Sequence, residues 1–282
     1  MPDAFPPPRW SSVASPARPR GLLIDPADIA PHLSDCAASI AAPRRPRAPA
    51  DAAEVAAVSG SARGGVPVVP QGGNTSMVGG ATPDEGGRGV VLSLARLNRI
   101  RDLDPLDMTM TAEAGVVLKA AQDAAAAAGC LFPLSLGAEG TATIGGVLST
   151  NAGGNTTVRY GNARELMLGL EVVLPDGSLW NGLRRLRKDN TGYALRHLFV
   201  GAEGTLGIVT AAVLRMFPRP RDTAVAFCAL VSEDAALALF RRFRDRDESA
   251  VRAFEYMSGA GVGLAAKHIE GVTLPLASPA GH

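Results

Sequence analysis

The chain has 282 residues, of which 46% are hydrophobic, and its 28 Lys and Arg residues nearly balance 27 Asp and Glu residues. This length and hydrophobic content suffice for one large or two modest domains with a proper core. The net charge of +1 and the aromatic content of 5% argue against a nucleic-acid partner. Three cysteines lie far apart and predict neither a disulfide framework nor a zinc site, so a reducing, cytoplasmic location is expected. The sequence contains no apolar run near the roughly 20 residues of a membrane span.

Residues 1–45 are expected to form a proline-rich disordered tail and a short helix. Asp25 followed by Pro26 is typical of a helix start. The arginines within residues 44–47 lie among prolines and predict a solvated basic turn rather than a binding patch. A signal peptide is not predicted, because the prolines interrupt the segment and no apolar core follows them.

Strand and helix patterns follow from residue 51 onward. Asp51 and Glu54 have capping-box spacing and predict a helix over residues 51–58, which the glycines after it should shorten or fray. An alanine-rich helix is predicted over residues 116–128, with Gly129 closing it. Strands are predicted at 66–69, 90–94, 108–114, 170–174 and 208–217, with an Asp-Gly turn at 176–177 leading to a further strand.

The first glycine-rich segment, residues 70–80, comes directly after a predicted buried strand. Glycine tolerates positive φ and lets backbone N–H groups approach a ligand, and successive N–H groups turned inward form an anion nest. No Lys or Arg lies between Arg63 and Arg88. The pattern indicates a pyrophosphate held by backbone dipoles rather than a phosphoryl group in transfer, which usually needs Lys and Mg²⁺. An ordinary loop between two strands is the alternative.

Two further glycine-rich segments follow, at residues 133–154 and 186–210. The first and second segments are almost free of charge, and together they favour one extended, dinucleotide-like cofactor. Neither contains G-x-G-x-x-G at the start of a helix, and G-x-x-x-x-G-K-[ST] is absent, so Rossmann and P-loop sites are not supported. In the third segment Glu203 lies among glycines, where it could bind a ligand hydroxyl or be a solvated carboxylate.

Five sequence runs then carry a resemblance to a known family. They are Val-Val-Pro-Gln-Gly-Gly-Asn-Thr at 68–75, Leu-Gly-Ala-Glu-Gly at 136–140, Thr-Asn-Ala-Gly-Gly at 150–154, Arg-Lys-Asp-Asn-Thr-Gly-Tyr at 187–193 and Glu-Gly-Thr-Leu-Gly-Ile at 203–208. With them the chain resembles the FAD-linked oxidases, whose FAD-binding domain is of the vanillyl-alcohol-oxidase or PCMH type. Within that group it is most similar to D-2-hydroxyglutarate dehydrogenase and bacterial 2-hydroxyacid dehydrogenases. The resemblance implies an α+β fold, with a PCMH-type FAD-binding domain of two α+β subdomains over 46–220 and the incomplete start of an α+β cap domain over 221–282.

The resemblance also implies how FAD is held. The first segment would hold the pyrophosphate and the second the adenosine side, the ribityl chain and the flavin end, while Glu203 and the following strand would close over the cofactor. Covalent relatives attach flavin through His or Cys, whereas this nest offers Ser76, so FAD is expected to be non-covalent. The expected cofactor-binding residues are Pro70, Gln71, Gly72, Gly73, Asn74, Thr75, Ser76, Gly79, Gly80, Leu136, Gly137, Gly140, Thr141, Ile144, Gly145, Gly146, Asn151, Gly154, Glu203, Gly207, Ile208 and Val209.

In the family the cap domain provides the arginine and lysine that hold the substrate carboxylate, a divalent metal site and a catalytic histidine. The chain shows none of these motifs, so no catalytic and no metal-binding residue is predicted. The histidines lack metal-ligand spacing, and His197 is expected to be structural. The cap is expected to begin with a strand over 224–231, a helix over 234–244 and a segment over 254–267. Leu237, Phe240 and Phe243 are then expected to lack partners and to expose an apolar patch.

The implied activity is FAD-dependent oxidation of a D-2-hydroxy acid such as D-2-hydroxyglutarate. The hydrogen on Cα would pass as hydride to flavin N5, and the electrons would continue to a carrier protein or a quinone. A truncated flavin-binding fragment without turnover of its own and a relative of the glycolate or D-lactate dehydrogenases are the alternatives. The sequence leaves the hydroxy acid, the electron acceptor and the oligomeric state open.

Overall fold

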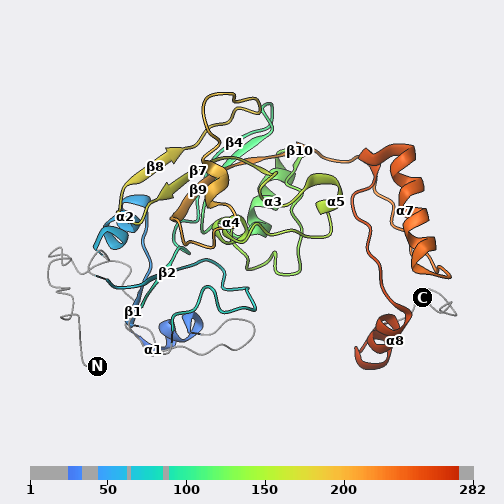
Figure 1. Ribbon diagram of the computed structural model, residues 1–282, viewed down its shortest axis with the longest axis horizontal. Helices are drawn as coiled ribbons and strands as arrows, with labels where there is room; N and C mark the ends of the chain where they lie inside the picture. The colour runs from blue at the N-terminus through green and yellow to red at the C-terminus, as the bar shows by residue number, and fades with distance from the viewer. Residues whose placement is uncertain (1–24, 34–43, 62–64, 85–88, 273–282) are drawn as a thin grey trace.

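A computed structural model of the protein describes residues 25–33, 44–61, 65–84 and 89–272 (Figure 1). The helices are α1 (Pro26–Ile29), α2 (Ala52–Ser61), α3 (Leu118–Ala127), α4 (Ile144–Ser149), α5 (Thr157–Tyr160), α6 (Arg196–Phe199), α7 (Glu233–Asp247) and α8 (Gly259–His268), with 3₁₀ turns η2 (Ala30–His32) and η4 (Glu248–Ala250). The strands are β1 (Arg44–Arg47), β2 (Val68–Gln71), β3 (Val90–Ser93), β4 (Ile100–Asp104), β5 (Thr109–Glu113), β6 (Cys130–Leu131), β7 (Met167–Val173), β8 (Leu179–Gly182), β9 (Ile208–Arg215) and β10 (Phe217–Pro218). The α+β class expected from the sequence is confirmed.

The smaller sheet is parallel, with strand order β1-β3-β2, and its central strand β3 is buried along its whole length. The expectation of a basic turn at residues 44–47 is wrong, because these residues form edge strand β1. In this strand Arg44 pairs with Val90 and Arg47 with Leu92. An edge strand pairs on one side only, so the missing N–H of Pro46 is tolerated there.

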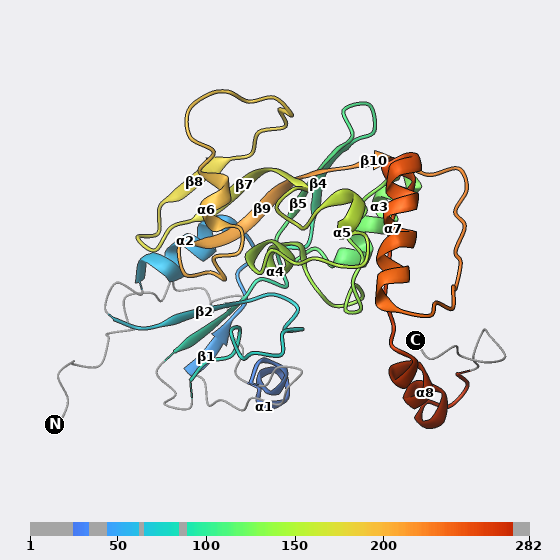
Figure 2. The same ribbon diagram turned by 45° about the vertical axis from the view of Figure 1, so that its right-hand side comes forward.

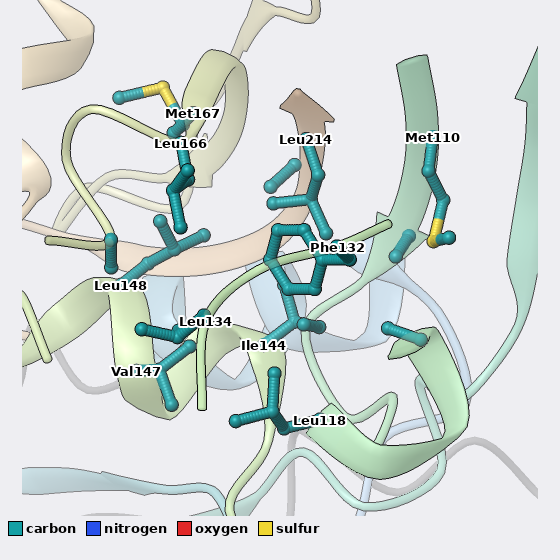
Figure 3. Close-up of a cluster of buried hydrophobic side chains, with 14 of the residues drawn as sticks. Met110, Leu118, Phe132, Leu134, Ile144, Val147, Leu148, Leu166, Met167 and Leu214 are labelled. Atoms are coloured by element: carbon teal, nitrogen blue, oxygen red, sulfur yellow. The ribbon is translucent and has the colours of Figure 1, made fainter. Parts of the chain in front are cut away.

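The larger sheet has five strands in the order β4-β5-β9-β7-β8, and every neighbouring pair is antiparallel. Helices α3 and α4 cover one face of this sheet. Figure 3 shows Leu118 of α3 and Ile144 of α4 gathered with Met110 of β5 and Leu214 of β9 in one buried cluster. Helix α3 ends as predicted, since Gly129 takes a φ of 73° directly after the last turn.

Helix α2 joins the two sheets, and Figure 2 shows it between them. Val55 of α2 is buried with Leu92 of β3, Val173 of β7 and Ile208 of β9 in a second apolar cluster. The two subdomains therefore share a core, and the segments that leave their strand ends are held at a fixed separation.

The start of α2 confirms the predicted cap. The N–H of Glu54 donates to Asp51 Oδ1 at 2.9 Å, and Glu54 Oε2 accepts from the N–H of Ala50 at 2.8 Å. The helix continues through Gly60 to Ser61, beyond the predicted residue 58. Packing of its buried Val55 and Ser59 compensates for the low helix propensity of glycine.

The last part of the chain stands apart from both sheets, with α7 and α8 at one side of the molecule (Figure 1). The strand expected at 224–231 is wrong, because that described segment is paired with no other strand. A strand needs a neighbour for its N–H and C=O groups, and the described residues provide no backbone hydrogen bond to this segment. The helix predicted at 234–244 is confirmed as the longer α7.

Of the three α7 side chains expected to be exposed, Leu237 and Phe243 are exposed and Phe240 is not. Leu237 is 58% and Phe243 is 48% exposed, whereas the ring of Phe240 packs against Phe254 with centroids 4.9 Å apart. Within the described ranges, the helices are all too short or too polar to cross a membrane.

Candidate functional site

The first two glycine-rich segments are packed directly against each other. A Cβ atom on Gly73 would lie 2.0 Å from the carbonyl oxygen of Thr141, and one on Gly72 would lie 2.4 Å from Oγ1 of Thr143. Real Cβ contacts are never this short, so only glycine allows the two backbones to meet here. Segments about 70 residues apart in the sequence therefore form one wall.

The third segment closes on the first. A Cβ on Gly204 would lie 2.7 Å from Cγ of Pro70, and one on Gly80 would lie 3.3 Å from Oε2 of Glu203. The N–H of Glu203 also donates to the carbonyl of Ser149, 2.9 Å away, in the second segment. The three segments that the sequence singles out are thus brought together.

Each of the three segments holds one non-glycine residue at positive φ. These residues are Asn74 at 52°, Asn151 at 50° and Glu203 at 51°. Such a conformation is uncommon for a residue with a Cβ, and it gathers at ligand-binding sites, where the surrounding structure enforces it. The three strained positions mark the place where the segments meet as a candidate binding site.

The first segment presents backbone donors. Four of its backbone N–H groups make no hydrogen bond to the described residues, namely those of Gly72, Gly73, Thr75 and Ser76. All four residues are half-buried. The described residues from 65 to 84 include no Lys or Arg. Free amide donors in a glycine-rich turn fit the pyrophosphate of a dinucleotide, which the sequence pattern predicts.

The side chain of Gln71 is turned away from solvent and is 1% exposed. Its Nε2 donates to the carbonyl of Ala81 at 2.8 Å and to that of His32 at 3.2 Å, and its Oε1 contacts Nδ1 of His32. Asn74 Nδ2 donates to the carbonyl of Pro31 at 3.3 Å. These predicted cofactor contacts therefore also hold η2 against the first segment. No sequence signal marks the pair, because His32 and Gln71 are 39 residues apart.

Helix α4 of the second segment is held by its own backbone donors. The N–H of Ile144 donates to Val116 at 2.9 Å and that of Gly145 to Ala114 at 2.7 Å, while Thr143 caps the helix by accepting from Gly146. A Cβ on Gly145 would lie 2.7 Å from Cβ of Ala114. The structure gives Ile144 and Gly145 a packing role beside β5, whichever ligand contacts they make.

Arg164 links the second segment to the third. Its backbone N–H donates to Asn151 Oδ1 at 3.0 Å, and its guanidinium donates to the carbonyls of His197, at 2.7 Å, and Val200. Burial, aided by the charges of Arg196 and Arg164, lowers the pKa of His197. The partial burial of His197 beside Arg164 agrees with the structural role expected for this histidine.

The side chains of Ile208 and Val209 are buried in the two apolar clusters of the protein. Ile208 is 6% and Val209 is 3% exposed, and they lie in the second and first apolar clusters respectively. A Cβ on Gly207 would lie 2.7 Å from Cγ1 of Val172. Only the backbone of these predicted cofactor residues is available to a ligand.

An open cavity of about 670 Å³ lies against the second segment. Three predicted residues line it, namely Leu136, Gly137 and Gly154, together with Ser135, Glu139, Gly153, Asn155 and Glu255. The sequence reasoning missed Glu139, which lies inside a quoted motif, and Glu255, for which no local signal exists. Oε2 of Glu139 accepts from Nε2 of Gln122 at 3.0 Å, which orients the carboxylate.

Metal-ligating side chains are scattered. Over residues 25–33, 44–61, 65–84 and 89–272, no group of three or more His, Cys, Asp and Glu side chains could hold a metal ion.

Comparison with known proteins gives consistent matches. The sequence model of the family described as FAD binding domain matches residues 43–182. The chain is 39% identical to "D-2-hydroxyglutarate--pyruvate transhydrogenase DLD3" of Saccharomyces cerevisiae, over 74% of this chain and 42% of the relative. It is 43% identical to "D-2-hydroxyglutarate dehydrogenase, mitochondrial" of Bos taurus, over 74% of this chain and 38% of the relative. The chain thus spans less than half the length of these curated relatives.

A solved structure titled "alkyldihydroxyacetonephosphate synthase in P212121" has a similar fold, with a TM-score of 0.69, over 80% of this chain and 43% of that one. Its sequence identity of 23% limits this likeness to the fold. The fold match agrees with the α+β architecture described above.

Proposed function

Because the chain belongs to the FAD binding domain family, we propose that it is the FAD-holding part of a D-2-hydroxyacid dehydrogenase, with D-2-hydroxyglutarate or a similar acid as its substrate. The convergence of three glycine-rich segments, each with a non-glycine residue at positive φ, carries the proposal. When bound, FAD supplies the acceptor for a hydride from the substrate Cα. The chain supplies the site that binds and orients it.

The residues of the first segment would hold the pyrophosphate through backbone N–H groups. A dipole nest neutralises an anion that is bound but not transferred, and it needs no cation. The walls from the second and third segments would enclose the rest of a non-covalent cofactor. The proposed contacts are the cofactor-binding residues named from the sequence, with Gln71, Ile144 and Gly145 acting partly through packing.

The open cavity does not suit the carboxylate of the substrate. Glu139 and Glu255 line it, and no Lys or Arg is among its lining residues. Like charges would disfavour a 2-hydroxy acid anion there. We therefore propose that the cations that hold the substrate, and any divalent metal, come from chain outside the described residues. Electrons would pass on to a carrier protein or a quinone.

We also retain the cytoplasm as the proposed location. The relative from Bos taurus has the word mitochondrial in its name. A relative from Xanthomonas citri that is 42% identical, over 68% of this chain and 40% of the relative, is named "D-2-hydroxyglutarate dehydrogenase" without a compartment.

The test is the visible absorption spectrum of the purified chain after incubation with FAD and desalting, followed by anaerobic D-2-hydroxyglutarate, D-lactate or glycolate. Retained flavin that bleaches with one acid would support the dehydrogenase and identify its substrate class. Retained flavin that stays oxidised with all three would fit an FAD-holding part that lacks its substrate-holding cations, and also the alternative, a flavin-binding fragment. A chain that keeps no flavin would contradict the proposal.

A further inference from the structure

We propose that His32 is a positioning residue for the first glycine-rich segment, which it locks through Gln71 so that the cofactor meets a preformed loop. The inference rests on the proposed FAD site. His32 belongs to the segment 25–33, which the sequence places next to an expected disordered tail. Along the sequence it is far from every motif that marks the cofactor site.

The hydrogen-bonding capacity of Gln71 identifies the role of His32. The Gln71 Nε2 group donates to two carbonyl oxygens, on Ala81 and on His32 itself. Its Oε1 can only accept, so the Nδ1 atom of His32 in contact with it must carry the proton. His32 thus satisfies the remaining polar atom of a side chain that is 1% exposed. An amide oxygen buried without a donor is costly, so the pair holds together.

Gln71 stands at the start of the first segment and Ala81 directly after its end. The bond from Gln71 to the Ala81 carbonyl therefore closes the segment into a loop. Contacts from Pro31 and His32 then hold that closed loop at two points, at Asn74 and at Gln71. Asn74 is the strained residue of the loop, with a φ of 52°.

The segment that carries His32 is itself ordered by local bonds. Asp25 Oδ1 accepts from the N–H of Ala27 at 2.8 Å, and the carbonyl of Asp25 accepts from the N–H of Ile29 at 3.0 Å. Residues 25–33 therefore form a capped helical turn followed by η2, which is an ordered support for His32. The free N–H groups of the loop are then fixed before a ligand arrives, and such preorganisation raises affinity by lowering the ordering cost of binding.

Four single variants of the full chain test the role. His32→Ala removes the ring, His32→Phe keeps a ring without a donor, and His32→Asn restores a side-chain N–H near the position of Nδ1. Asp28→Asn on the exposed side of α1 is the matched control. Each is measured for FAD affinity by flavin fluorescence titration, and without FAD by hydrogen exchange of Val78 and Thr82, whose N–H groups donate hydrogen bonds within and at the end of the loop.

We expect His32→Ala and His32→Phe to weaken FAD binding about tenfold and to accelerate exchange in the apo loop at least as much. His32→Asn should stay within about threefold of the parent, and Asp28→Asn should match it. Melting temperatures that stay close to that of the parent would separate positioning from folding. If His32→Ala fails to fold, His32→Phe decides, because it preserves the packing.

Parent-like FAD affinity and parent-like exchange in both variants without the donor would overturn the inference. Failure of His32→Asn to rescue them would overturn it too, since the role would then lie in the ring and not in the donor. If the parent chain binds no FAD, the proposed function fails, while exchange of the apo loop still decides whether His32 holds it.

Discussion

The backbone of Gly73 meets the carbonyl group of Thr141 so closely that a Cβ on the glycine would lie 2.0 Å from the oxygen. A glycine in a nest is usually explained by the approach of a ligand. Here the same glycine is required by a second protein segment. Packing between the first and second segments and the proposed binding of FAD therefore depend on the same residue.

We predict that Gly73→Ala abolishes FAD retention and destabilises the fold by about 2 kcal/mol. The added methyl group meets rigid backbone, so the two segments must separate, and overpacking of this kind typically costs 1–3 kcal/mol. Urea unfolding and the absorption spectrum after desalting measure the two effects.

Gly140→Ala is the matched control for that variant. Gly140 lies one residue before Thr141, has no positive φ and has nothing within 4 Å of an added Cβ. It should change stability by no more than about 0.5 kcal/mol. Equal stability of the two variants would contradict the packing argument.

Arg101 joins two buried carboxylates on the face of the larger sheet that is opposite α3 and α4. Its Nε donates to Glu113 Oε1 at 3.2 Å and its Nη2 to Glu171 Oε1 at 3.0 Å. The side chains of Glu113 and Glu171 are 1% and 8% exposed. We predict that Arg101→Met destabilises the protein by about 2 kcal/mol, less than a fully buried pair would lose because Arg101 is partly exposed.

Arg244→Met supplies the comparison for the buried network. Arg244, in the last turn of α7, pairs with Glu248 directly after the helix, and both side chains are at least half exposed. This variant should lose less than about 0.5 kcal/mol in urea unfolding. A loss as large as that of Arg101→Met would show that burial is not the deciding factor.

The pH dependence of stability should reflect Glu113. Burial by itself raises the pKa of Glu113, but hydrogen bonds from Arg99 and Arg101 outweigh it and hold the pKa below the ordinary value of 4.5. The unfolded chain therefore binds the proton more readily than the folded one, so stability rises with pH. The contribution is present above the unfolded pKa and is lost as the pH falls through the folded one.

We accordingly predict that Glu113→Gln lowers stability at pH 7 and flattens its decline below pH 5. The check is the urea midpoint of the parent and the variant at pH 7, 5, 4 and 3. Glu248→Gln, at the exposed pair on α7, should keep the slope of the parent. A Glu113→Gln profile parallel to that of the parent would contradict the assignment.

The exposed apolar side chains of α7 predict self-association. Leu237 and Phe243 are about half exposed, and large apolar side chains exposed on one helix can form part of an interaction surface. The double variant Leu237→Lys and Phe243→Lys should sediment with a smaller associated fraction while changing stability by less than about 0.5 kcal/mol. Sedimentation velocity over a range of concentrations measures this, and an unchanged profile would count against the prediction.

Local chemistry was predictable wherever a few neighbouring residues decide the backbone. Asp51 and Glu54 start α2, Gly129 ends α3, and Gly177 turns β7 into β8 with a φ of 83°. In each case the deciding interaction spans a few residues, so the sequence carries all of it. The glycine-rich segments were visible for the same reason.

The sequence-based predictions were wrong at two segments whose strand formation depends on a neighbouring strand. Residues 44–47 join a sheet because β3 lies beside them, although their composition is typical of a turn. Residues 224–231 have the composition of a strand and remain unpaired among the described residues. Strand formation requires backbone partners that are distant in sequence, so composition could not decide either segment.

The sequence by itself singled out three glycine-rich segments, the first two of them almost free of charge, and predicted that they serve one extended cofactor, because glycine content and charge are properties of composition. Only the tertiary structure decided that Gly73 must also fit Thr141, that Arg101 bridges Glu113 and Glu171, and that His32 reaches Gln71. Each of these contacts joins residues far apart along the chain, and their geometry exists only after the two sheets have packed around α2.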